Sequence, residues 1–518
     1  MKKMKSLFTG FGLLGCLLIL SFSAVHAQQK KSLPNIVYIL ADDMGYGDVA
    51  AFNADAKVKT PNIDRLTKEG MRFTDAHTTS SVCTPSRYSI LTGRYPWRSR
   101  LSVGVLRGYS RTLIDEGQPT VASMLKTKSY HTGVVGKWHL GMDWVPKDAY
   151  KDSIKPEYNK DKMFGVAREM NPDQIDFSKT ATGGPATQGF DYSYVLPASL
   201  DMPPYVYVQN GHITEPLTGY TKGNKLESGY TGPFWREGLM AQNFDFSDVL
   251  PSFTRKADDF IIKESGKKEP FFLYFPMPAP HTPWMPGQAF VGKSQAGEYG
   301  DYVQEVDDAV GKVLHTLDSL GIADNTVVFF ASDNGPYWRP NFVEMFHHSA
   351  AGPFRGMKGD VFEGGHRVPF IIRYPGKVQP GTVSDAPTTL ANLMATCADI
   401  TGQSSSKFET EDSYSVYPIM TGKAKLNAEQ PAIVNISSRG YFDIRKGSWK
   451  LIDKLGSGGF TAPSFVKPVP GGPVGQLYNL SDDIHEDHNL YEQYPEKVKE
   501  LTELLMKIKK AEKGKRAK

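Results

Sequence analysis

Short apolar runs, each ended by a polar turn, recur along much of the chain. They are rich in β-branched and aromatic residues and too short to be typical helices, so each predicts a buried strand. These runs lie at residues 34–40, 131–138, 270–275, 325–331 and 368–372. Because they are apolar throughout, they favour strands that are covered on both faces of a sheet.

Segments of helical character alternate with these runs. Thr60 and Pro61 favour a helix start and Gly70 favours its end, while residues 121–126 and 388–400 also predict helices. The clearest helical spacing is that of Val303, Val306, Val310, Val313, Leu314 and Leu317. Strands alternating with helices indicate an α/β fold, with a largely parallel sheet sandwiched by helices.

The pattern changes after Pro431. Turn residues there separate short apolar runs at 432–436, 441–444, 449–451 and 476–480. A helix is predicted from Tyr494 onward, so this part reads as a small antiparallel sheet with one helix. The sequence therefore predicts two domains after residue 33, a large α/β domain at 34–430 and a small antiparallel-sheet subdomain at 431–518.

The first 27 residues are typical of a secretory signal peptide. Three lysines precede a short apolar stretch, and residues 25–27 offer a small-x-small cleavage site. We therefore expect an exported protein, located in the bacterial periplasm, with no transmembrane segment in the mature chain. A membrane anchor and a lipid anchor at Cys16 are the alternatives. Cys16 lies inside the apolar stretch rather than after it, which disfavours lipidation.

Composition narrows the class of protein further. Of the 518 residues, 40% are hydrophobic and 22% charged, which is ordinary globular usage, and a net charge of +4 offers no basic field for nucleic acid. Three cysteines, at 16, 83 and 397, exclude a disulfide scaffold and a multi-cysteine zinc cluster. Cys397 lies on an apolar helix face and is expected in the core. Cys83 lies in a polar motif, which marks it as a reactive candidate, although pairing of the two remains open.

Two polar pairs follow two of the predicted strands. Asp42 and Asp43 come after the run at 34–40, and Asp333 and Asn334 come after the run at 325–331. Ligands of parallel sheets bind beyond the carboxyl ends of the strands. Either pair alone would be ordinary turn chemistry. Together, four oxygen-bearing side chains favour a hard divalent cation such as Ca²⁺ or Mg²⁺.

A second motif surrounds Cys83. It reads Cys-Thr-Pro-Ser-Arg at 83–87 and is followed by Leu-Thr-Gly-Arg at 91–94. Pro85 favours a helix start, so Cys83 should lie at a helix N-terminus, where the dipole would lower the pKa of the thiol. The alternative is a buried structural cysteine. The arginine spacing of a cysteine-based phosphatase loop is absent.

These motifs resemble the maturation signature of the formylglycine-dependent sulfatases, arylsulfatase-type enzymes of the alkaline-phosphatase-like superfamily. Further resemblances follow in family order at residues 136–141, 280–283, 332–335, 358–359 and 363–369. The similarity covers nearly the whole mature chain. It implies an alkaline-phosphatase-like fold, and the small C-terminal sheet also fits the family.

The resemblance also implies a role for each site residue. Cys83 would be oxidised by a separate sulfatase-maturating enzyme to formylglycine (3-oxoalanine), whose hydrate is the nucleophile and becomes transiently sulfated. One Ca²⁺ would be bound by residue 83 with Asp42, Asp43, Asp333 and Asn334. Arg87 would stabilise the hydrate, and His139 would be the base that releases sulfate. The sulfate would be held by Lys137, His281 and Lys358, with His281 as our choice of general acid.

Other residues are candidates for substrate binding. The segment 197–201 loosely matches a family landmark, which makes Ser199 a possible sulfate ligand. Three histidines near matched elements could bind substrate hydroxyls or serve only in turns: His347, His348 and His366. Four aromatic residues could stack on sugar rings or pack in loops: Trp235, Trp284, Tyr337 and Trp338.

The sequence thus predicts an exported sulfatase that hydrolyses sulfate esters on a sulfated glycan. A glycosaminoglycan or related glycan is the expected substrate, with a 6-sulfated galactose-type sugar as the first choice. One alternative is a phosphomonoester or phosphonate hydrolase of the same superfamily. The other is a non-catalytic protein that binds sulfated glycans, which would leave Cys83 unmodified.

Overall fold

The computed structural model describes residues 33–101, 103–151, 169–224, 232–408 and 410–511. Leu33–Lys518 form one compact unit. The predicted signal peptide and Cys16 lie outside the described residues. Within the described ranges, no helix is long and apolar enough to cross a membrane.

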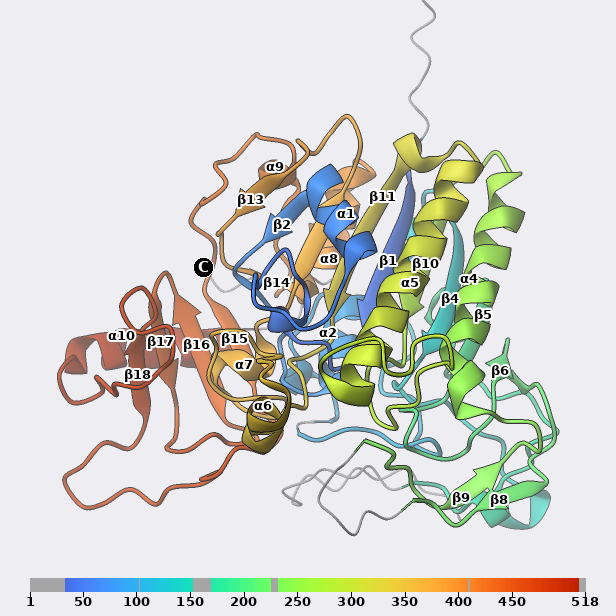
Figure 1. Cartoon of the computed structure of the whole chain (residues 1–518), viewed down its shortest axis with the longest axis horizontal. Helices are drawn as coiled ribbons and strands as arrows, with labels where there is room; N and C mark the ends of the chain where they lie inside the picture. Colours follow the sequence, from blue (N-terminus) through green and yellow to red (C-terminus); the bar gives the residue numbers. More distant parts are fainter. Residues whose placement is uncertain (1–32, 102, 152–168, 225–231, 409, 512–518) are drawn as a thin grey trace, which may run out of the picture. The chain divides into compact units, whose positions relative to one another are not determined.

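Ten strands of the described chain form the main sheet (Figure 1). Its centre is parallel: β1 (Asn35–Ala41) lies between β10 (Phe271–Pro276) and β11 (Thr326–Ser332), and β4 (His131–Lys137) and β5 (Tyr192–Leu196) follow beyond β10. The outer strands are β12 (Phe370–Arg373), β2 (Met71–Phe73), β13 (Thr382–Ser384), β6 (Val208–Gln209) and β7 (His212–Ile213). The predicted largely parallel sheet is confirmed, with antiparallel pairing where β12 meets its neighbours and where β6 joins β5 and β7 at the other edge.

The residues of β1 show why its sequence is apolar throughout. Ile36, Tyr38 and Leu40 pack into one hydrophobic cluster, and the alternate residues Val37, Ile39 and Ala41 pack into another. Both faces of the strand are therefore buried, as expected of a parallel sheet between helices.

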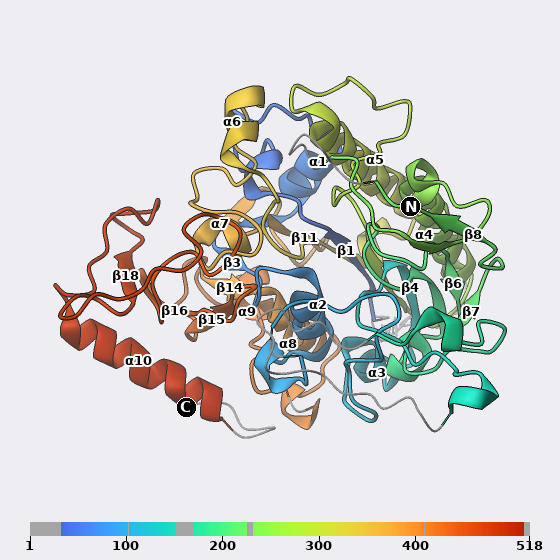
Figure 2. The same cartoon turned by 90° about the horizontal axis from the view of Figure 1, so that it is seen from below.

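Helices cover both faces of this sheet (Figures 1 and 2). One layer consists of α1 (Pro61–Glu69), α4 (Val249–Ser265) and α5 (Gly297–Ser319). The other contains α2 (Cys83–Thr92), α3 (Val121–Lys126) and α8 (Leu393–Ile400). Cys397 of α8 is fully buried in that layer, so its predicted core position is confirmed. Cys83 and Cys397 are both free thiols.

One predicted helix starts later than expected. The segment 388–400 becomes helical only at Leu390, where a 3-10 turn (Leu390–Asn392) leads into α8, because Thr388 and Thr389 form a short strand, β14, that pairs with β3 (Ala76–His77). The β-branched threonines favour an extended backbone. The backbone N–H of Thr388 donates to the carbonyl of Asp75 (2.9 Å), which holds this extended start in place.

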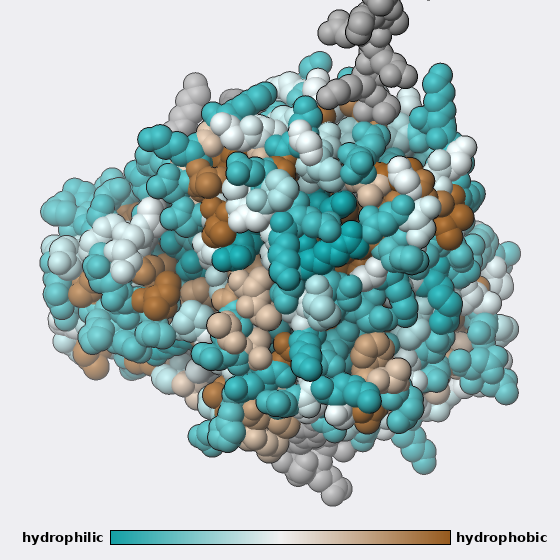
Figure 3. Space-filling model, turned by 45° about the horizontal axis from the view of Figure 1, so that its top comes forward, coloured by the Kyte–Doolittle hydropathy of each residue, from teal (hydrophilic) through white to brown (hydrophobic). Residues whose placement is uncertain are grey.

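The C-terminal part forms a separate four-stranded antiparallel sheet among the described residues. Its strands pair in chain order and are β15 (Ile433–Ile436), β16 (Phe442–Lys446), β17 (Trp449–Ile452) and β18 (Gln476–Asn479). The helix α10 (Pro495–Lys510) packs Leu501 and Leu505 against Val434 and Leu451. The elements predicted for this region are therefore present. On the face shown in Figure 3 the surface is mostly hydrophilic, with hydrophobic residues in small separate spots.

Candidate active site

The two polar pairs meet at one edge of the main sheet. Ala41 and Ser332 are register partners at the ends of β1 and β11, so the residues that follow them lie side by side. The backbone N–H of Asp43 donates to Oδ1 of Asp333 (3.2 Å), and the amide of Asn334 donates to Oδ1 of Asp43 (2.6 Å). Two neighbouring parallel strands thus deliver four buried oxygen-bearing side chains to one place.

Cys83 is the first residue of α2 and faces this group. Its Sγ lies 3.7 Å from Oδ1 of Asp42, and the residue is only 2% exposed. Burial raises the pKa of the thiol to about 12, although Lys137 and Lys358 act to lower it. The prediction of a lowered thiol pKa was wrong, because loss of hydration outweighs the helix N-terminus and both lysines.

Arg87 lies one turn further along α2, on the same face as Cys83. Its Nε and Nη2 contact Oδ2 of Asp333 at 2.9 and 2.8 Å, and Nη1 donates to the carbonyl of Lys137 (3.0 Å). Burial acts to lower the pKa of Arg87, but the carboxylates of Asp333 and Asp42 raise it above its ordinary value. This arginine therefore stays charged and fixes the orientation of Asp333 behind Cys83.

Lys137 and Ser199 join the cluster from adjacent strands. Lys137 ends β4, and its Nζ donates to Oδ2 of Asp42 (2.6 Å) and to Oγ of Ser199 (3.1 Å). Ser199 follows β5, the parallel neighbour of β4. The loosely matched segment 197–201 thus places its serine beside a lysine that is fully buried.

Lys358 and His281 approach Asp43 from loops. Nζ of Lys358 donates to Oδ2 of Asp43 (2.7 Å), and Nε2 of His281 lies 3.6 Å from the same oxygen. The ring of His281 is also 3.4 Å from Oγ of Ser199. Burial lowers the pKa of His281, and nearby Lys358 lowers it further. Besides Arg87, the cluster therefore carries three basic side chains around its carboxylates: Lys137, His281 and Lys358.

His139 lies on the wall of the cavity into which Cys83 opens. Its Nε2 contacts the carbonyl oxygen of Leu106 (2.8 Å), and since a carbonyl can only accept, Nε2 carries the proton. Nδ1 is then the basic nitrogen, and it has no hydrogen-bond partner within the described ranges. Burial, with Lys137 and Arg87 nearby, holds the pKa of His139 well below its ordinary value.

The cavity above Cys83 has a volume of about 510 Å³. Asp43, His139, His281 and Lys358 line it beside Cys83. Its other walls are lined by residues that the sequence did not mark as site candidates: Arg107, Asp201, Phe234, Arg236, Ser438 and Phe460. Asp201 falls within the segment 197–201 that was noted for Ser199. No motif marks the others, because they come from loops that are far apart in the sequence.

The oxygen-rich end of the cluster fits a hard divalent cation. One candidate ligand atom from each of Asp42, Asp43, Cys83 and His281 lies within 4.8 Å of the others. Oδ1 of Asn334 is buried and has no hydrogen-bond partner in the described part of the chain. A buried amide oxygen without a partner is costly unless a ligand satisfies it. Carboxylate and amide oxygens are the ligands that Ca²⁺ prefers.

The other candidate residues lie in several places. His348 is buried beside Asp48 (Nε2 to Oδ1, 2.7 Å), and His347 ends the helix α6 (Pro340–Phe346). His366 belongs to a different buried cluster, described below. Trp284 and Trp338 pack together in an aromatic cluster (6.1 Å between rings), whereas Tyr337 lines the cavity above Cys83 and Trp235 lines a second cavity.

Comparisons with known proteins agree with this arrangement. The family model described as Sulfatase matches residues 34–403. An N-acetylgalactosamine-6-O-sulfatase of Bacteroides thetaiotaomicron is 35% identical, covering 93% of this chain and 94% of its own. Human arylsulfatase A is 30% identical, covering 88% and 83%.

A solved structure of a similar protein has the same fold. It comes from work on the metabolism of multiple glycosaminoglycans by Bacteroides thetaiotaomicron and superposes with a TM-score of 0.77 at 33% identity. The match covers 92% of this chain and 99% of that one. The fold is therefore the alkaline-phosphatase-like fold of sulfatases. This chain belongs to the sulfatase family and is a sulfuric ester hydrolase.

Proposed function

We propose that this enzyme removes 6-O-sulfate groups from N-acetylgalactosamine in glycosaminoglycan-type glycans, after export to the periplasm. The observation that carries the proposal is a group of basic side chains beside Cys83: His281 and Lys358 line the cavity, and Lys137 lies buried behind them against Asp42. A sulfate ester spreads negative charge over its oxygens, and such a group can bind it. The choice of sugar is supported by the 35% identity to the N-acetylgalactosamine-6-O-sulfatase.

We also propose a modified form of residue 83, formylglycine, and a bound Ca²⁺ ion. A separate maturating enzyme converts Cys83 to formylglycine, whose hydrate supplies one hydroxyl as nucleophile and a second one for release of the sulfate. Asp42, Asp43, Asp333, Asn334 and residue 83 would hold a Ca²⁺ ion, which would supply positive charge beside the nucleophile. The burial of Cys83 at the N-terminus of α2 keeps residue 83 in one orientation for this chemistry.

The basic side chains bind the substrate and meet its growing charge. Nζ of Lys137 and Nζ of Lys358 approach the carboxylates of Asp42 and Asp43 from either side, and each can also donate to a sulfate oxygen above Cys83. Ser199 offers a further donor beside Lys137. Because these donors are already in place before the reaction, they stabilise the transition state without reorganisation.

Proton transfer falls to the two histidines. His281 lines the cavity and is placed to protonate the departing sugar oxygen; the negative charge of a bound sulfate favours its protonated form. His139 lies on the cavity wall with Nε2 held by the carbonyl of Leu106 and with Nδ1 unpartnered among the described residues. Nδ1 can therefore accept a proton from residue 83 when the sulfate is released.

A comparison of ester substrates tests the reaction and the sugar. The matured protein is given N-acetylgalactosamine 6-sulfate, its 4-sulfate isomer and the corresponding 6-phosphate, and released anion is measured. We expect the 6-sulfate to give the highest kcat/KM. Preference for the phosphate would overturn the proposed reaction, and preference for the 4-sulfate would overturn the proposed position.

Export is tested separately. We expect the natural host to hold the protein in its periplasmic fraction with Gln28 as the first residue, since the small-x-small site ends at residue 27. N-terminal sequencing of the purified protein checks this. An intact N-terminus on active cytoplasmic protein would contradict the localisation.

A further inference from the structure

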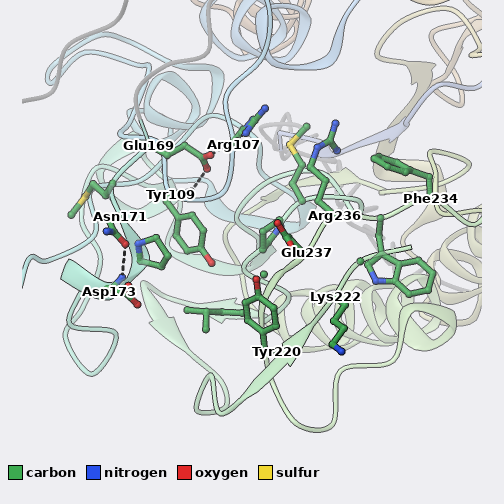
Figure 4. A pocket seen from close by; sticks show the side chains of 18 residues that line it. Arg107, Tyr109, Glu169, Asn171, Asp173, Tyr220, Lys222, Phe234, Arg236 and Glu237 are labelled. Atoms are coloured by element: carbon green, nitrogen blue, oxygen red, sulfur yellow. Dashed lines mark hydrogen bonds and ion pairs between the residues drawn. The ribbon is translucent and has the colours of Figure 1, made fainter. Parts of the chain in front are cut away.

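A second cavity adjoins the cavity above Cys83. It has a volume of about 830 Å³. Four residues line both cavities: Arg107, Met202, Phe234 and Arg236. Figure 4 shows the second cavity, with Arg107 and Arg236 together on one side and Tyr220 and Lys222 on the other. A ligand held above Cys83 can therefore extend past this shared wall.

The lining of the second cavity combines aromatic rings with polar groups. Tyr220 lies on β8 (Gly219–Thr221), which pairs with β9 (Gly238–Met240), and Trp235 lies in the segment that leads into β9. Tyr220 is 61% exposed, so its ring is open to a ligand in the second cavity. Asn171, Asp173 and Glu237 add hydrogen-bonding groups around these rings. Apolar ring faces with a few polar groups are common features of a small-molecule site. They also suit a sugar, which has apolar C–H faces and polar hydroxyl groups around its edge.

Among the described residues, one cation that lines the second cavity has no ion pair. Arg107 pairs with Glu169 (3.5 Å), and Arg236 pairs with Asp201. Lys222 forms no ion pair with any residue in the described ranges, and it lies near Tyr220 in Figure 4. An exposed ammonium group beside an exposed ring can bind a sugar that carries a carboxylate or a second sulfate.

We propose that the second cavity binds the sugar next to the sulfated one, so that the enzyme acts on oligosaccharides rather than on free monosaccharides. This inference rests on the proposed function. Tyr220 stacks on the neighbouring sugar, and Lys222 pairs with its anionic group. Arg236 and Phe234 lie where the glycosidic linkage passes from one cavity to the other.

The test compares substrates of different length on the matured enzyme. The probes are 4-nitrophenyl sulfate, N-acetylgalactosamine 6-sulfate, and chondroitin-6-sulfate oligosaccharides of about three and four sugars, lengths chosen so that at least one neighbour can reach the second cavity. We expect kcat/KM on the better oligosaccharide to exceed that on the monosaccharide by about tenfold or more, the gain of one charge-assisted contact.

Two variants locate the effect. Tyr220→Ala and Lys222→Ala should each lower kcat/KM on the oligosaccharide by about tenfold, the worth of one such contact, while 4-nitrophenyl sulfate and the monosaccharide are unaffected. Tyr494→Ala and Lys128→Ala change exposed residues of the same types elsewhere and should alter neither substrate.

The results distinguish failure of this inference from failure of the proposed function. Equal kcat/KM on monosaccharide and oligosaccharide would overturn the inference and leave the proposed function standing. Equal losses on all substrates in the two variants, or hydrolysis of the aryl sulfate with no sugar accepted, would also overturn it. Wild-type enzyme that hydrolyses no sulfate ester at all would instead overturn the proposed function.

Discussion

Two buried clusters of charged residues have similar composition and very different surroundings. The open cluster consists of Asp42, Asp43, Cys83, Lys137, His281, Asp333 and Lys358 and lies beneath the cavity above Cys83. The closed cluster consists of Asp75, His77, Glu363, His366, Arg445, Lys450 and Glu486. It connects β3 and the short helix α7 (Glu363–His366) to β16 and β17 of the small sheet.

The closed cluster pairs its charges internally. Arg445 donates to both oxygens of Asp75 (2.6 and 2.7 Å), and Lys450 donates to Glu363 (3.0 Å). Nδ1 of His77 and Nδ1 of His366 lie 3.0 Å apart, within hydrogen-bonding distance. None of its seven residues lines either of the two cavities described above.

The comparison shows what separates a site from a structural ion network. His77, Glu363 and His366 are close enough together for a metal ion, as are members of the open cluster. However, cations neutralise the carboxylates of both clusters, and the difference lies in access. None of the closed cluster's residues lines either cavity, whereas Asp43, Cys83, His281 and Lys358 do, beside His139, whose Nδ1 has no partner in the described part of the chain. Unsatisfied groups beside a cavity, rather than buried charge itself, mark the place of chemistry.

The largest expected effect tests the open cluster. Cys83→Ala should lower kcat on a sulfate ester by at least about 10⁴-fold, because the nucleophile is lost, with little change in Tm. Sulfate release and thermal unfolding measure the two quantities. Cys397→Ala is the matched control, a fully buried cysteine in the core, and should keep full activity. If Cys83→Ala kept its turnover, the open cluster would not be the catalytic one, and this difference between the two clusters would be wrong.

The next effect concerns the proposed general acid. His281→Ala should lower kcat by about 10²–10³-fold on a sugar sulfate, whose leaving oxygen needs a proton, and by much less on an activated aryl sulfate. Steady-state kinetics on the two substrates give the ratio. If both substrates lose activity equally, His281 binds sulfate but does not protonate the leaving group.

A third variant targets the closed cluster. Lys450→Met leaves Glu363 and Glu486 buried without their common cation, so the free energy of unfolding should fall by about 3–5 kcal/mol. Denaturant unfolding measures this, and kcat per folded molecule should stay within about twofold of wild type, because no contact with substrate is removed. A large loss of kcat in folded protein would show that the closed cluster takes part in catalysis.

The smallest expected effect is a pH dependence of stability. Burial, with help from Glu363, raises the pKa of Glu486 to about 7, although Lys450 acts to lower it. The folded state therefore keeps a proton that the unfolded state has lost, so this stabilisation is complete below about pH 4 and disappears as pH rises through about 7. Glu486→Gln should flatten the fall in Tm between pH 5 and 7. Equal slopes in wild type and variant would contradict this assignment.

The sequence predicted the open cluster better than the closed one for a physical reason. Strand ends in a parallel sheet meet at one edge, so Asp42 and Asp333 could be brought together from their positions after apolar runs. The pairing of His77 with His366 depends on how α7 packs beside β3, which no local pattern encodes.

Burial and loop contacts could also not be predicted from the sequence. The pKa of the Cys83 thiol depends on how many atoms surround it, and these come from several distant segments. The second cavity depends on the conformation of loops around Tyr220 and Arg236. Trp235, a candidate for either sugar stacking or loop packing, lines this second cavity rather than the one above Cys83.

The most direct test of the account is mass spectrometry of the peptide that contains residue 83, from catalytically active protein. The account predicts formylglycine at this position, seen as a peptide that has lost the sulfur of Cys83 and gained an aldehyde oxygen. Reaction of the peptide with a hydrazide reagent confirms the aldehyde. Fully active protein in which residue 83 is an unmodified cysteine thiol would contradict the account.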